Sequence, residues 1–322
     1  MSNSVLGGVM GLSVGDALGV PVEFSTRAEL SENPVVGMGS FGTYSLPAGT
    51  WSDDTSMTMC LAESLCKGLD YKDIMDNFLK WITTGAFTPF GKVFGVGNGT
   101  RRALEKYARG VPPLKCGGTA ETDNGNGSLM RILPLVFYLE SAYGLEKIQS
   151  EEAMTIIHNV SSLTHAHSRS LIACGIYISV AAELLRLGDL AAAVETGIGK
   201  AIQYYFKRAE FNEELKHYQR LSFLPAFVNT PKSQINSSGY VVDTLEAAIW
   251  CLLNTKNYKD SVLMAVNLGG DTDTVAAVTG GLAGLYYGYN SIPKEWLAVI
   301  VKRDYIESLC NKLYKTLKVN NK

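Results

Sequence analysis

The chain has 322 residues, of which 46% are hydrophobic and 19% charged, a balance that supports a substantial buried core. Its net charge of -2 and the lack of a long basic run give no reason to expect a nucleic-acid partner. Six scattered cysteines without a C-x-x-C pair make a zinc site improbable and favour reduced thiols in a cytoplasmic protein.

Helical periodicity dominates the chain, and strand signals are few. The first predicted helix places Val5, Val9, Leu12 and Asp16 on one face and ends near Gly19, because the following Pro21 restricts its continuation. Further helices are predicted at residues 54–67, 71–83, 98–109, 127–142, 151–163, 168–187, 189–206, 242–254, 257–266, 272–288 and 302–317.

Two irregular stretches separate these helices. Residues 32–50 are rich in Gly, Ser and Pro and are expected to form a long functional loop, and residues 220–241 lack periodicity as well. The N-terminal apolar stretch is interrupted early and the longest apolar run, residues 171–182, is short, so neither secretion nor a membrane span is expected. No linker or internal repeat divides the chain, so the sequence predicts one all-α domain over residues 1–322.

The end of the first helix carries two acidic residues. Asp16 lies on an otherwise apolar face and must find polar partners. Glu23 follows Pro21 on a predicted loop, where it could reach a ligand as a mobile acid or base. A solvated loop glutamate is an equally good interpretation.

Two short acidic clusters precede predicted helices: Trp51-Ser52-Asp53-Asp54-Thr55 and Gly269-Gly270-Asp271-Thr272-Asp273-Thr274. Either cluster alone could be a helix N-cap with solvated carboxylates, because aspartate is favourable at a helix N-terminus. Four aspartates buried together would need a cation, and hard oxygen ligands suit Mg²⁺ or Mn²⁺. Converging helix starts would supply enough oxygens for one or two ions, which could orient a substrate diol and acidify a water.

Two glycine-rich junctions could approach phosphate. The stretch Asp123-Asn124-Gly125-Asn126-Gly127-Ser128 precedes a predicted helix, whose N-terminus would add its positive end. It is not a Walker A loop, and a simple loop–helix junction is an equally good interpretation. Gly97-Asn98-Gly99-Thr100 is a weaker example of the same pattern.

Two further features concern packing and side-chain direction. His165 and His167 are spaced at i and i+2, so at most one of them is expected to face a site, and a capping or core histidine is the commoner interpretation of each.

The small residues Ala277, Gly281, Gly284 and Gly288 form a stripe on the helix after the second acidic cluster. Glycine costs roughly 1 kcal/mol relative to alanine inside a helix, so the stripe predicts a close helix–helix approach.

In their order along the chain, these motifs resemble the ADP-ribosylglycohydrolase family. The matching segments cover nearly the whole chain: Gly15-Asp16-Ala17-Leu18-Gly19 with Glu23, Trp51-Ser52-Asp53-Asp54-Thr55, Gly125-Asn126-Gly127-Ser128-Leu129-Met130-Arg131, Thr164-His165-Ala166-His167 and Gly269-Gly270-Asp271-Thr272-Asp273-Thr274. The resemblance implies a single domain built as an orthogonal helical bundle, with a binuclear Mg²⁺ or Mn²⁺ centre.

The resemblance also implies roles for individual residues. The metal ligands would be Ser52, Asp53, Asp54, Asp271, Asp273 and Thr274. Glu23 would correspond to the mobile glutamate of the family, near the metals and the scissile bond. The substrate-binding residues would be Asn98, Asp123, Gly125, Asn126, Gly127, Ser128 and His165.

The implied activity is hydrolysis of the glycosidic bond between ADP-ribose and a modified side chain, with Asp53, Asp54 or Glu23 accepting the proton of the attacking water. Arginine is the first expectation for the leaving group, and serine or O-acetyl-ADP-ribose are alternatives. Gly95 stands where many arginine-specific relatives carry an aspartate, which puts strict arginine specificity in question.

Two rival functions predict different products. A catalytically silent ADP-ribose-binding or immunity protein would leave every linkage intact, and a metal-dependent phosphohydrolase would release phosphate or AMP. The partner in the favoured interpretation is an ADP-ribosylated protein or ADP-ribose, bound by a monomer that involves neither nucleic acid nor membrane.

Overall fold

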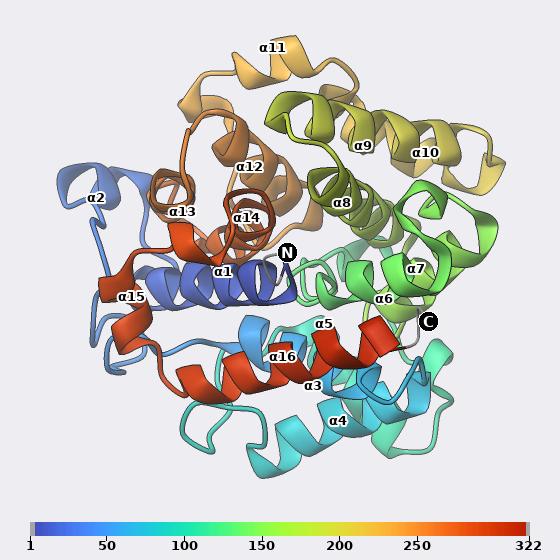
Figure 1. Ribbon diagram of the computed structural model, residues 1–322, viewed down its shortest axis with the longest axis horizontal. Helices are drawn as coiled ribbons and strands as arrows, with labels where there is room; N and C mark the ends of the chain where they lie inside the picture. Colours follow the sequence, from blue (N-terminus) through green and yellow to red (C-terminus); the bar gives the residue numbers. More distant parts are fainter. Residues whose placement is uncertain (1–3, 320–322) are drawn as a thin grey trace.

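The N-terminal helix α1 (Ser4–Gly19) lies at the centre of the protein, against α14 (Thr272–Tyr287), in a computed structural model that describes residues 4–319. In Figure 1 the helices α12 to α14 lie on one side of α1, and α3, α4 and α16 lie on the other. No β-strand is present among residues 4–319, only isolated bridges, which confirms the predicted all-α fold.

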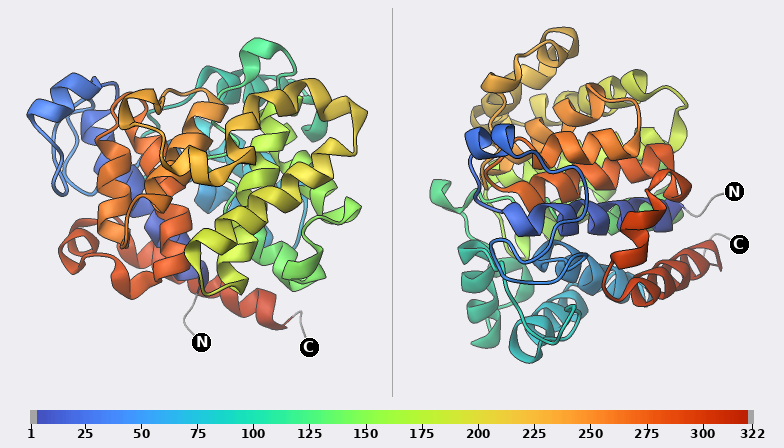
Figure 2. Two further views of the ribbon diagram at one scale, coloured as in Figure 1. Left: turned by 90° about the horizontal axis from the view of Figure 1, so that it is seen from above. Right: turned by 90° about the vertical axis from the view of Figure 1, so that its left-hand side faces the viewer.

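Within the described residues, sixteen α-helices form this arrangement, joined by loops and short 3₁₀ turns (Figures 1 and 2). The remaining helices are α2 (Arg27–Glu32), α3 (Asp53–Leu65), α4 (Tyr71–Thr84), α5 (Asn98–Ala108), α6 (Pro134–Tyr143), α7 (Glu151–Ser162), α8 (Ser168–Arg186), α9 (Leu190–Phe206), α10 (Asn212–Leu215), α11 (Leu224–Val228), α12 (Val241–Leu253), α13 (Tyr258–Val266), α15 (Lys294–Val299) and α16 (Arg303–Val319).

Glycine makes the contact between α1 and α14 possible. A Cβ atom at Gly11 would overlap the carbonyl of Gly280, and one at Gly284 would overlap the carbonyl of Gly7. The predicted close approach is therefore confirmed at Gly284. Gly281 instead faces the hydroxyl of Tyr177 on α8, where a Cβ atom would lie 2.7 Å from that oxygen. The close packing fixes the start of α14, and with it the second acidic cluster, beside α1.

One predicted helix boundary is wrong. The helix expected over residues 127–142 begins only at Pro134, and residues 127–131 form turns instead. Proline has no N–H to donate to the preceding turn and its ring fixes φ near the helical value, so Pro134 occupies the first position of α6. The glycine-rich junction therefore leads into a turn and not directly into a helix.

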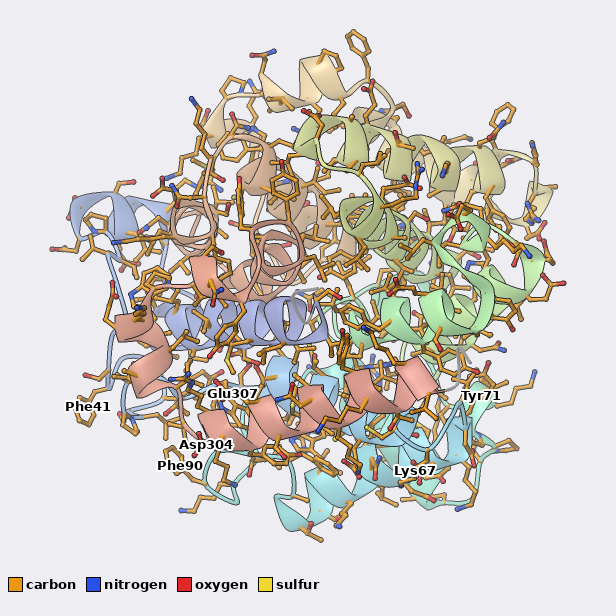
Figure 3. All side chains as sticks on the ribbon, in the orientation of Figure 1. Phe41, Lys67, Tyr71, Phe90, Asp304 and Glu307 are labelled. Carbon is orange, nitrogen blue, oxygen red and sulfur yellow. The ribbon has the colours of Figure 1, made fainter. Side chains whose placement is uncertain are left out.

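The two irregular stretches differ in the structure. Residues 33–52 contain no helix and form the long loop that the sequence predicts, at the left of Figure 1 and facing the viewer in the right-hand view of Figure 2. The exposed side chain of Phe41 on this loop extends outward at the left of Figure 3. Residues 220–241, also predicted to be irregular, contain the short helix α11 and two 3₁₀ turns. The short helices α2, α10 and α15 have too few turns to produce a recognisable periodicity, and the sequence prediction missed them.

The most apolar helices belong to the core. The segment Ser4–Val22 and helix α8 are long and apolar enough to cross a membrane by length and composition, but 83% of each such window is buried within the protein. All six cysteines are free, and five of them are buried.

Candidate metal centre and adjoining cavity

The starts of α3 and α14 meet in the folded chain, which confirms the predicted convergence of the two acidic clusters. The hydroxyl of Thr274, on the first turn of α14, donates to Oδ2 of Asp54 at 3.4 Å. Ser52, the N-cap of α3, donates its hydroxyl to the same oxygen at 3.0 Å. Two helix N-termini, each with the positive end of its dipole, therefore meet at one group of carboxylates.

Asp16 of α1 holds the start of α3 in place. Its carboxylate accepts hydrogen bonds from the backbone N–H of Ser52 at 2.9 Å and of Thr55 at 3.0 Å, and from the Thr55 hydroxyl at 2.6 Å. The polar partners that the sequence requires for Asp16 are thus found in the first acidic cluster. This carboxylate joins the central helix to the metal-ligand candidates.

The aspartates are buried without a positive partner. Asp16, Asp53, Asp54 and Asp273 are all buried, and within residues 4–319 none of them forms an ion pair with Lys, Arg or His. Burial raises the pKa of Asp16 to about 6 and, together with the charge of neighbouring carboxylates, raises the pKa values of Asp53, Asp54 and Asp273 well above their usual range. Such a cluster is costly unless a cation neutralises it.

Unsatisfied oxygen atoms mark where a cation fits. Oδ1 of Asp54 and Oε2 of Glu23 are buried and have no hydrogen-bond partner. Two groups of carboxylates have ligand atoms within 4.8 Å of one another: Asp16, Asp54 and Asp273, and Glu23, Asp271 and Asp273. All of these donors are oxygen atoms, which suits a hard divalent cation and fits the metal implied by the motifs.

This geometry brings two more acidic residues into the cluster, beside the ligands expected from the sequence. Asp16 and Glu23 lie within coordinating distance of the cluster, although the oxygens of Asp16 already accept hydrogen bonds from Ser52 and Thr55. Their signal in the sequence was an acidic residue on an apolar helix face and another just after it.

Glu23 follows a 3₁₀ turn at Val20–Val22 and is only 8% exposed, which excludes the interpretation as a solvated loop residue. Burial raises the pKa of Glu23 to about 7; the neighbouring Tyr44 hydroxyl opposes this increase, and the charge of Asp271 adds to it. The hydroxyl of Thr43 donates to the Glu23 carbonyl at 2.8 Å, so the long loop of residues 33–52 holds this segment against the acidic cluster.

A cavity of about 460 Å³ opens beside the carboxylates. It is lined by eleven of the site residues that the sequence predicts: Glu23, Asp53, Asn98, Asp123, Gly125, Asn126, Gly127, His165, Asp271, Asp273 and Thr274. Ser52 and Asp54 lie in the acidic cluster behind this wall. Ser128 does not line the cavity, because its hydroxyl contacts Ser161 and Cys174 in the core.

The N-terminus of α5 forms one wall of the cavity. Its N-cap residue Gly97 supplies no side-chain hydrogen bond, and the hydroxyl of Thr100 is buried without a partner. Thr100 faces the glycine-rich loop, since a Cβ atom at Gly127 would lie 3.0 Å from its Oγ1. Free N–H groups, the helix dipole and an unsatisfied hydroxyl together form a site that suits an anion.

His165 lies between this helix and the glycine-rich loop. Cβ atoms at Gly99 and Gly127 would each lie 2.8 Å from its ring. Burial, with the charge of Arg131, lowers the pKa of His165 to about 3, so its imidazole is neutral. Its Nδ1 lies 2.9 Å from the Thr164 hydroxyl, which accepts a hydrogen bond from Arg131. That hydroxyl can donate its proton to Nδ1, and in the tautomer that accepts it the ring proton lies on Nε2, on the cavity side.

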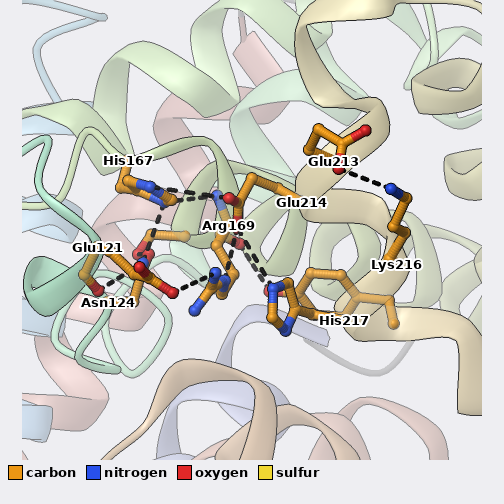
Figure 4. Close-up of polar contacts among 10 residues, drawn as sticks. Glu121, Asn124, His167, Arg169, Glu213, Glu214, Lys216 and His217 are labelled. Atoms are coloured by element: carbon orange, nitrogen blue, oxygen red, sulfur yellow. Dashed lines mark hydrogen bonds and ion pairs between the residues drawn. The ribbon is translucent and has the colours of Figure 1, made fainter.

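His165 lines the cavity and His167 does not, which confirms the expectation that at most one of the two histidines faces the site. Nδ1 of His167 accepts the backbone N–H of Arg169 at 3.2 Å as the N-cap of α8, and it lies 3.0 Å from Nδ2 of Asn124 (Figure 4). Arg169 in turn pairs with Glu214 at 2.6 Å and with Glu121 at 3.3 Å. This network supports the glycine-rich loop from behind.

Thr100 belongs to the weak phosphate-binding junction expected from the sequence and Met130 to a family-matching segment without a role, whereas five further cavity residues were missed by the sequence analysis: Phe24, Val96, Arg102, Thr122 and Gly239. Arg102 forms an ion pair with Asp123 at 2.6 Å on the cavity wall. Arg102 lies two residues after the Gly97–Thr100 junction, one helical turn from Asn98, and this position is the signal that could have identified it. Phe24 and Gly239 carry no pattern of their own and enter the cavity only through the fold.

Gly95 also lines the cavity, and its backbone has a positive φ of 77°. A Cβ atom at this position would lie 2.6 Å from Oδ1 of Asp53. A side chain here would therefore require the Asp53 carboxylate or the loop to shift. The aspartate that is absent from this position has no room in the present arrangement.

Known proteins match the chain along almost its full length. The family model described as ADP-ribosylglycohydrolase matches residues 1–322. The chain is 32% identical over 317 residues to "ADP-ribosylarginine hydrolase Tri1" of Serratia proteamaculans, covering 96% of this chain and 78% of that protein. It is 33% identical over 299 residues to "ADP-ribosyl-[dinitrogen reductase] glycohydrolase" of Rhodospirillum rubrum, covering 91% and 88%.

A solved structure gives the same result at the level of the fold. The structure titled "ADP-ribosylglycohydrolase-related protein complex" is similar to the chain with a TM-score of 0.78 and 33% sequence identity, and the match covers 98% of each chain.

Proposed function

Because this chain belongs to the ADP-ribosylglycohydrolase family, we propose that it removes ADP-ribose from modified arginine side chains by hydrolysing the N-glycosidic bond. Two of its relatives are named ADP-ribosylarginine hydrolase or ADP-ribosyl-[dinitrogen reductase] glycohydrolase. The observation that carries the proposal is the pair of acidic helix starts beside a cavity of about 460 Å³, within the usual size range of small-molecule sites. The substrate is an ADP-ribosylated protein, and the reaction reverses mono-ADP-ribosylation.

The acidic cluster holds two divalent cations, Mg²⁺ or Mn²⁺, in this proposal. The support is that two carboxylate groups within coordinating distance share Asp273, and that Asp54 and Glu23 each retain an unsatisfied oxygen. Ser52, Asp53, Asp54, Asp271, Asp273 and Thr274 are the proposed ligands. When bound, such ions supply the positive charge that the cluster lacks and polarise water and the ribose hydroxyls.

The carboxylates of Glu23, Asp53 and Asp54 have different roles in the proposed reaction. Glu23 lies at the boundary between the cavity and the cluster, so its free Oε2 is placed to accept the proton of the attacking water. Asp53 lines the cavity as well and is the alternative base, whereas Asp54 lies behind the wall and serves as a ligand only. The carboxylates also stabilise positive charge that develops at the ribose C1 as the glycosidic bond breaks.

The diphosphate binds at the opposite part of the cavity. The N-terminus of α5, the Thr100 hydroxyl and the glycines of the 125–127 loop provide the donors, and His165 adds a neutral N–H from Nε2. Because the buried His165 is neutral, it contributes a hydrogen bond and no net charge. Asn98 and Asp123 complete the wall on either side of the α5 start.

Product analysis on matched peptides tests this function. Peptides that carry ADP-ribosyl-arginine or ADP-ribosyl-serine, together with O-acetyl-ADP-ribose, are incubated with the protein and Mg²⁺ or Mn²⁺, and the products are separated by chromatography. The proposal predicts intact ADP-ribose and unmodified arginine peptide. Intact substrates with tight ADP-ribose binding would indicate a silent binding protein instead, and release of AMP or phosphate would indicate a phosphohydrolase.

A further inference from the structure

Phe24 is an exposed aromatic residue at the acidic end of the cavity. It directly follows Glu23, its backbone N–H donates to the carbonyl of Gly270 at 2.8 Å, and Gly270 precedes the ligand candidate Asp271. Its side chain lines the cavity and is 69% exposed. Among the described residues that line the cavity, Phe24 supplies the only phenyl ring and no tyrosine or tryptophan is present.

The backbone of Phe24 is strained. Its φ of 68° lies in the left-handed region, which is unfavourable for a bulky residue. Hydrogen bonds on both sides enforce this conformation: the Thr43 hydroxyl holds the carbonyl of Glu23, and the Gly270 N–H donates to the carbonyl of Ser25 at 2.9 Å. The result is that Glu23 is buried among the aspartates while the next residue presents its ring to solvent.

An exposed phenyl ring on a strained backbone gains nothing within the isolated protein. Burial of the ring elsewhere would be favourable, and a glycine at this position would remove the strain. Phe41 on the long loop has a similar φ of 70° and is 65% exposed, but it does not line the cavity. What distinguishes Phe24 is that its ring lies on the cavity wall beside Glu23, where a bound ligand can contact it.

The position of Phe24 identifies which part of a ligand it meets. The phosphate-binding groups proposed above surround His165, Gly99 and Gly127, whereas Phe24 adjoins Glu23 and the loop that carries Asp271. A ribose bound at the carboxylates directs the group on its C1 to this end of the cavity.

We propose that Phe24 is a specificity-determining residue whose ring stacks on the guanidinium group of the ADP-ribosylated arginine. This inference rests on the proposed function. A planar, weakly hydrated guanidinium packs well on an aromatic face, and the carboxylates at the same end of the cavity favour a cation. A serine linkage offers no such group, so the ring gives arginine-linked substrates an advantage that does not depend on a carboxylate at position 95.

Steady-state kinetics and binding together test the role of Phe24. In Phe24→Ala, KM for an ADP-ribosyl-arginine peptide is expected to rise about 3- to 30-fold, from the strength of a cation–π contact, while the Kd for free ADP-ribose stays within about twofold. Phe24→Trp should match or improve on the native KM, because tryptophan is the best cation–π partner. Phe24→Leu should recover only part of the effect. Phe206→Ala, which removes an equally exposed phenyl ring from α9 that does not line the cavity, serves as the matched control and should change nothing.

A stability measurement separates this role from a structural one. Phe24→Gly removes the left-handed strain, so its Tm should equal or exceed that of the native protein while KM rises. A lower Tm in Phe24→Gly would indicate that the ring supports the fold. An equal weakening of free ADP-ribose binding in Phe24→Ala would place the ring on the nucleotide and overturn the proposal, as would an unchanged KM or a Leu variant as good as Phe.

Failure of the proposed function gives a different pattern. If the native protein cleaves no arginine linkage, the binding of the intact ADP-ribosyl-arginine peptide is compared with that of ADP-ribose by calorimetry, in Glu23→Gln and in Glu23→Gln/Phe24→Ala. A selective loss of peptide affinity in the double variant supports the stacking contact without any turnover. Equal affinities in the two variants contradict it.

Discussion

Asn126 donates from its Nδ2 to Oδ2 of Asp271 at 2.8 Å, which ties the glycine-rich loop directly to the second acidic cluster. The same amide group donates to the hydroxyl of Thr244 on α12 at 2.9 Å. Asn126, in the wall proposed to bind phosphate, thus orients Asp271, a proposed metal ligand. This hydrogen bond connects the phosphate-binding part of the site to the metal-binding part.

Asn126→Ala should therefore weaken metal binding although Asn126 is not among the proposed ligands. Loss of a hydrogen bond that orients a ligand typically reduces metal affinity or activity by about 10- to 100-fold. Titration of Mn²⁺ against activity measures the change, and Asn229→Ala, at a surface asparagine far along the chain, is the control. An Mn²⁺ dependence identical to that of the native protein would show that the contact does not orient Asp271.

Divalent cations should stabilise the folded chain, because they bind a cluster of buried carboxylates that the unfolded chain does not assemble. A free cation concentration of about 100 times Kd raises the unfolding free energy by about 2.7 kcal/mol. Asp54→Asn should raise the Tm of the EDTA-treated protein, since one buried charge is removed, and should reduce the increase in Tm on addition of Mg²⁺ or Mn²⁺. Thermal denaturation with and without cation measures both effects. An unchanged Tm on cation addition to the native protein argues against the centre.

Arg169 should contribute more to stability through Glu214 than through Glu121. The pair with Glu214 is largely buried, and loss of one partner of a buried pair costs about 3 kcal/mol. The Glu121 carboxylate is 78% exposed, and such surface pairs contribute about 0–1 kcal/mol. Denaturant unfolding of Glu214→Gln and Glu121→Gln measures the difference, and equal effects would contradict the assignment.

Stability should fall on the acidic side in part through His158. Burial lowers the pKa of His158 to about 4, and its Nε2 lies 2.9 Å from the Tyr205 hydroxyl. Between pH 6.5 and 4 the unfolded chain binds more protons at this residue than the folded chain. The unfolding free energy therefore falls by up to about 1.4 kcal/mol per pH unit as the pH is lowered, and the contribution is complete above pH 6.5. His158→Gln should flatten this slope, and the exposed His217→Gln should not. An unchanged slope in His158→Gln would rule out the contribution.

The acidic motifs were predictable because their composition is costly without a partner. Four aspartates at two helix starts demand a cation, and that chemical requirement predicted the meeting of the two clusters before any contact was known. The spacing of His165 and His167 similarly predicted that only one would face the site. In each case a short sequence pattern imposed a physical requirement on the folded structure: neutralisation of buried charge for the aspartates, and opposite side-chain directions for the histidines.

The remaining parts of the site depend on tertiary geometry that no local pattern encodes. Phe24 looks like an ordinary loop residue and Arg102 like an ordinary helix residue, and both line the cavity only because the Glu23 segment and α5 face the glycine-rich loop. The start of α6 was mispredicted because helical periodicity continued past a boundary that Pro134 sets. The side chain of Ser128 turns to the core for a similar reason, since the turn before Pro134 directs it toward Ser161.

Three expectations stay predictions: a single domain over the whole chain, a monomeric state and a cytoplasmic location. Size-exclusion chromatography with light scattering at several protein concentrations tests the second directly. A molar mass that increases with protein concentration would show that the protein self-associates and is not a monomer.

Release of intact ADP-ribose from an ADP-ribosyl-arginine peptide, followed through removal and return of the cation, tests the central claim most directly. The account predicts activity with Mg²⁺ or Mn²⁺, its loss in EDTA, its recovery when the cation is restored, and no recovery in Asp273→Asn. Full activity of the native protein in EDTA, or full activity of Asp273→Asn, would contradict the assignment of this acidic cluster as the hydrolytic centre.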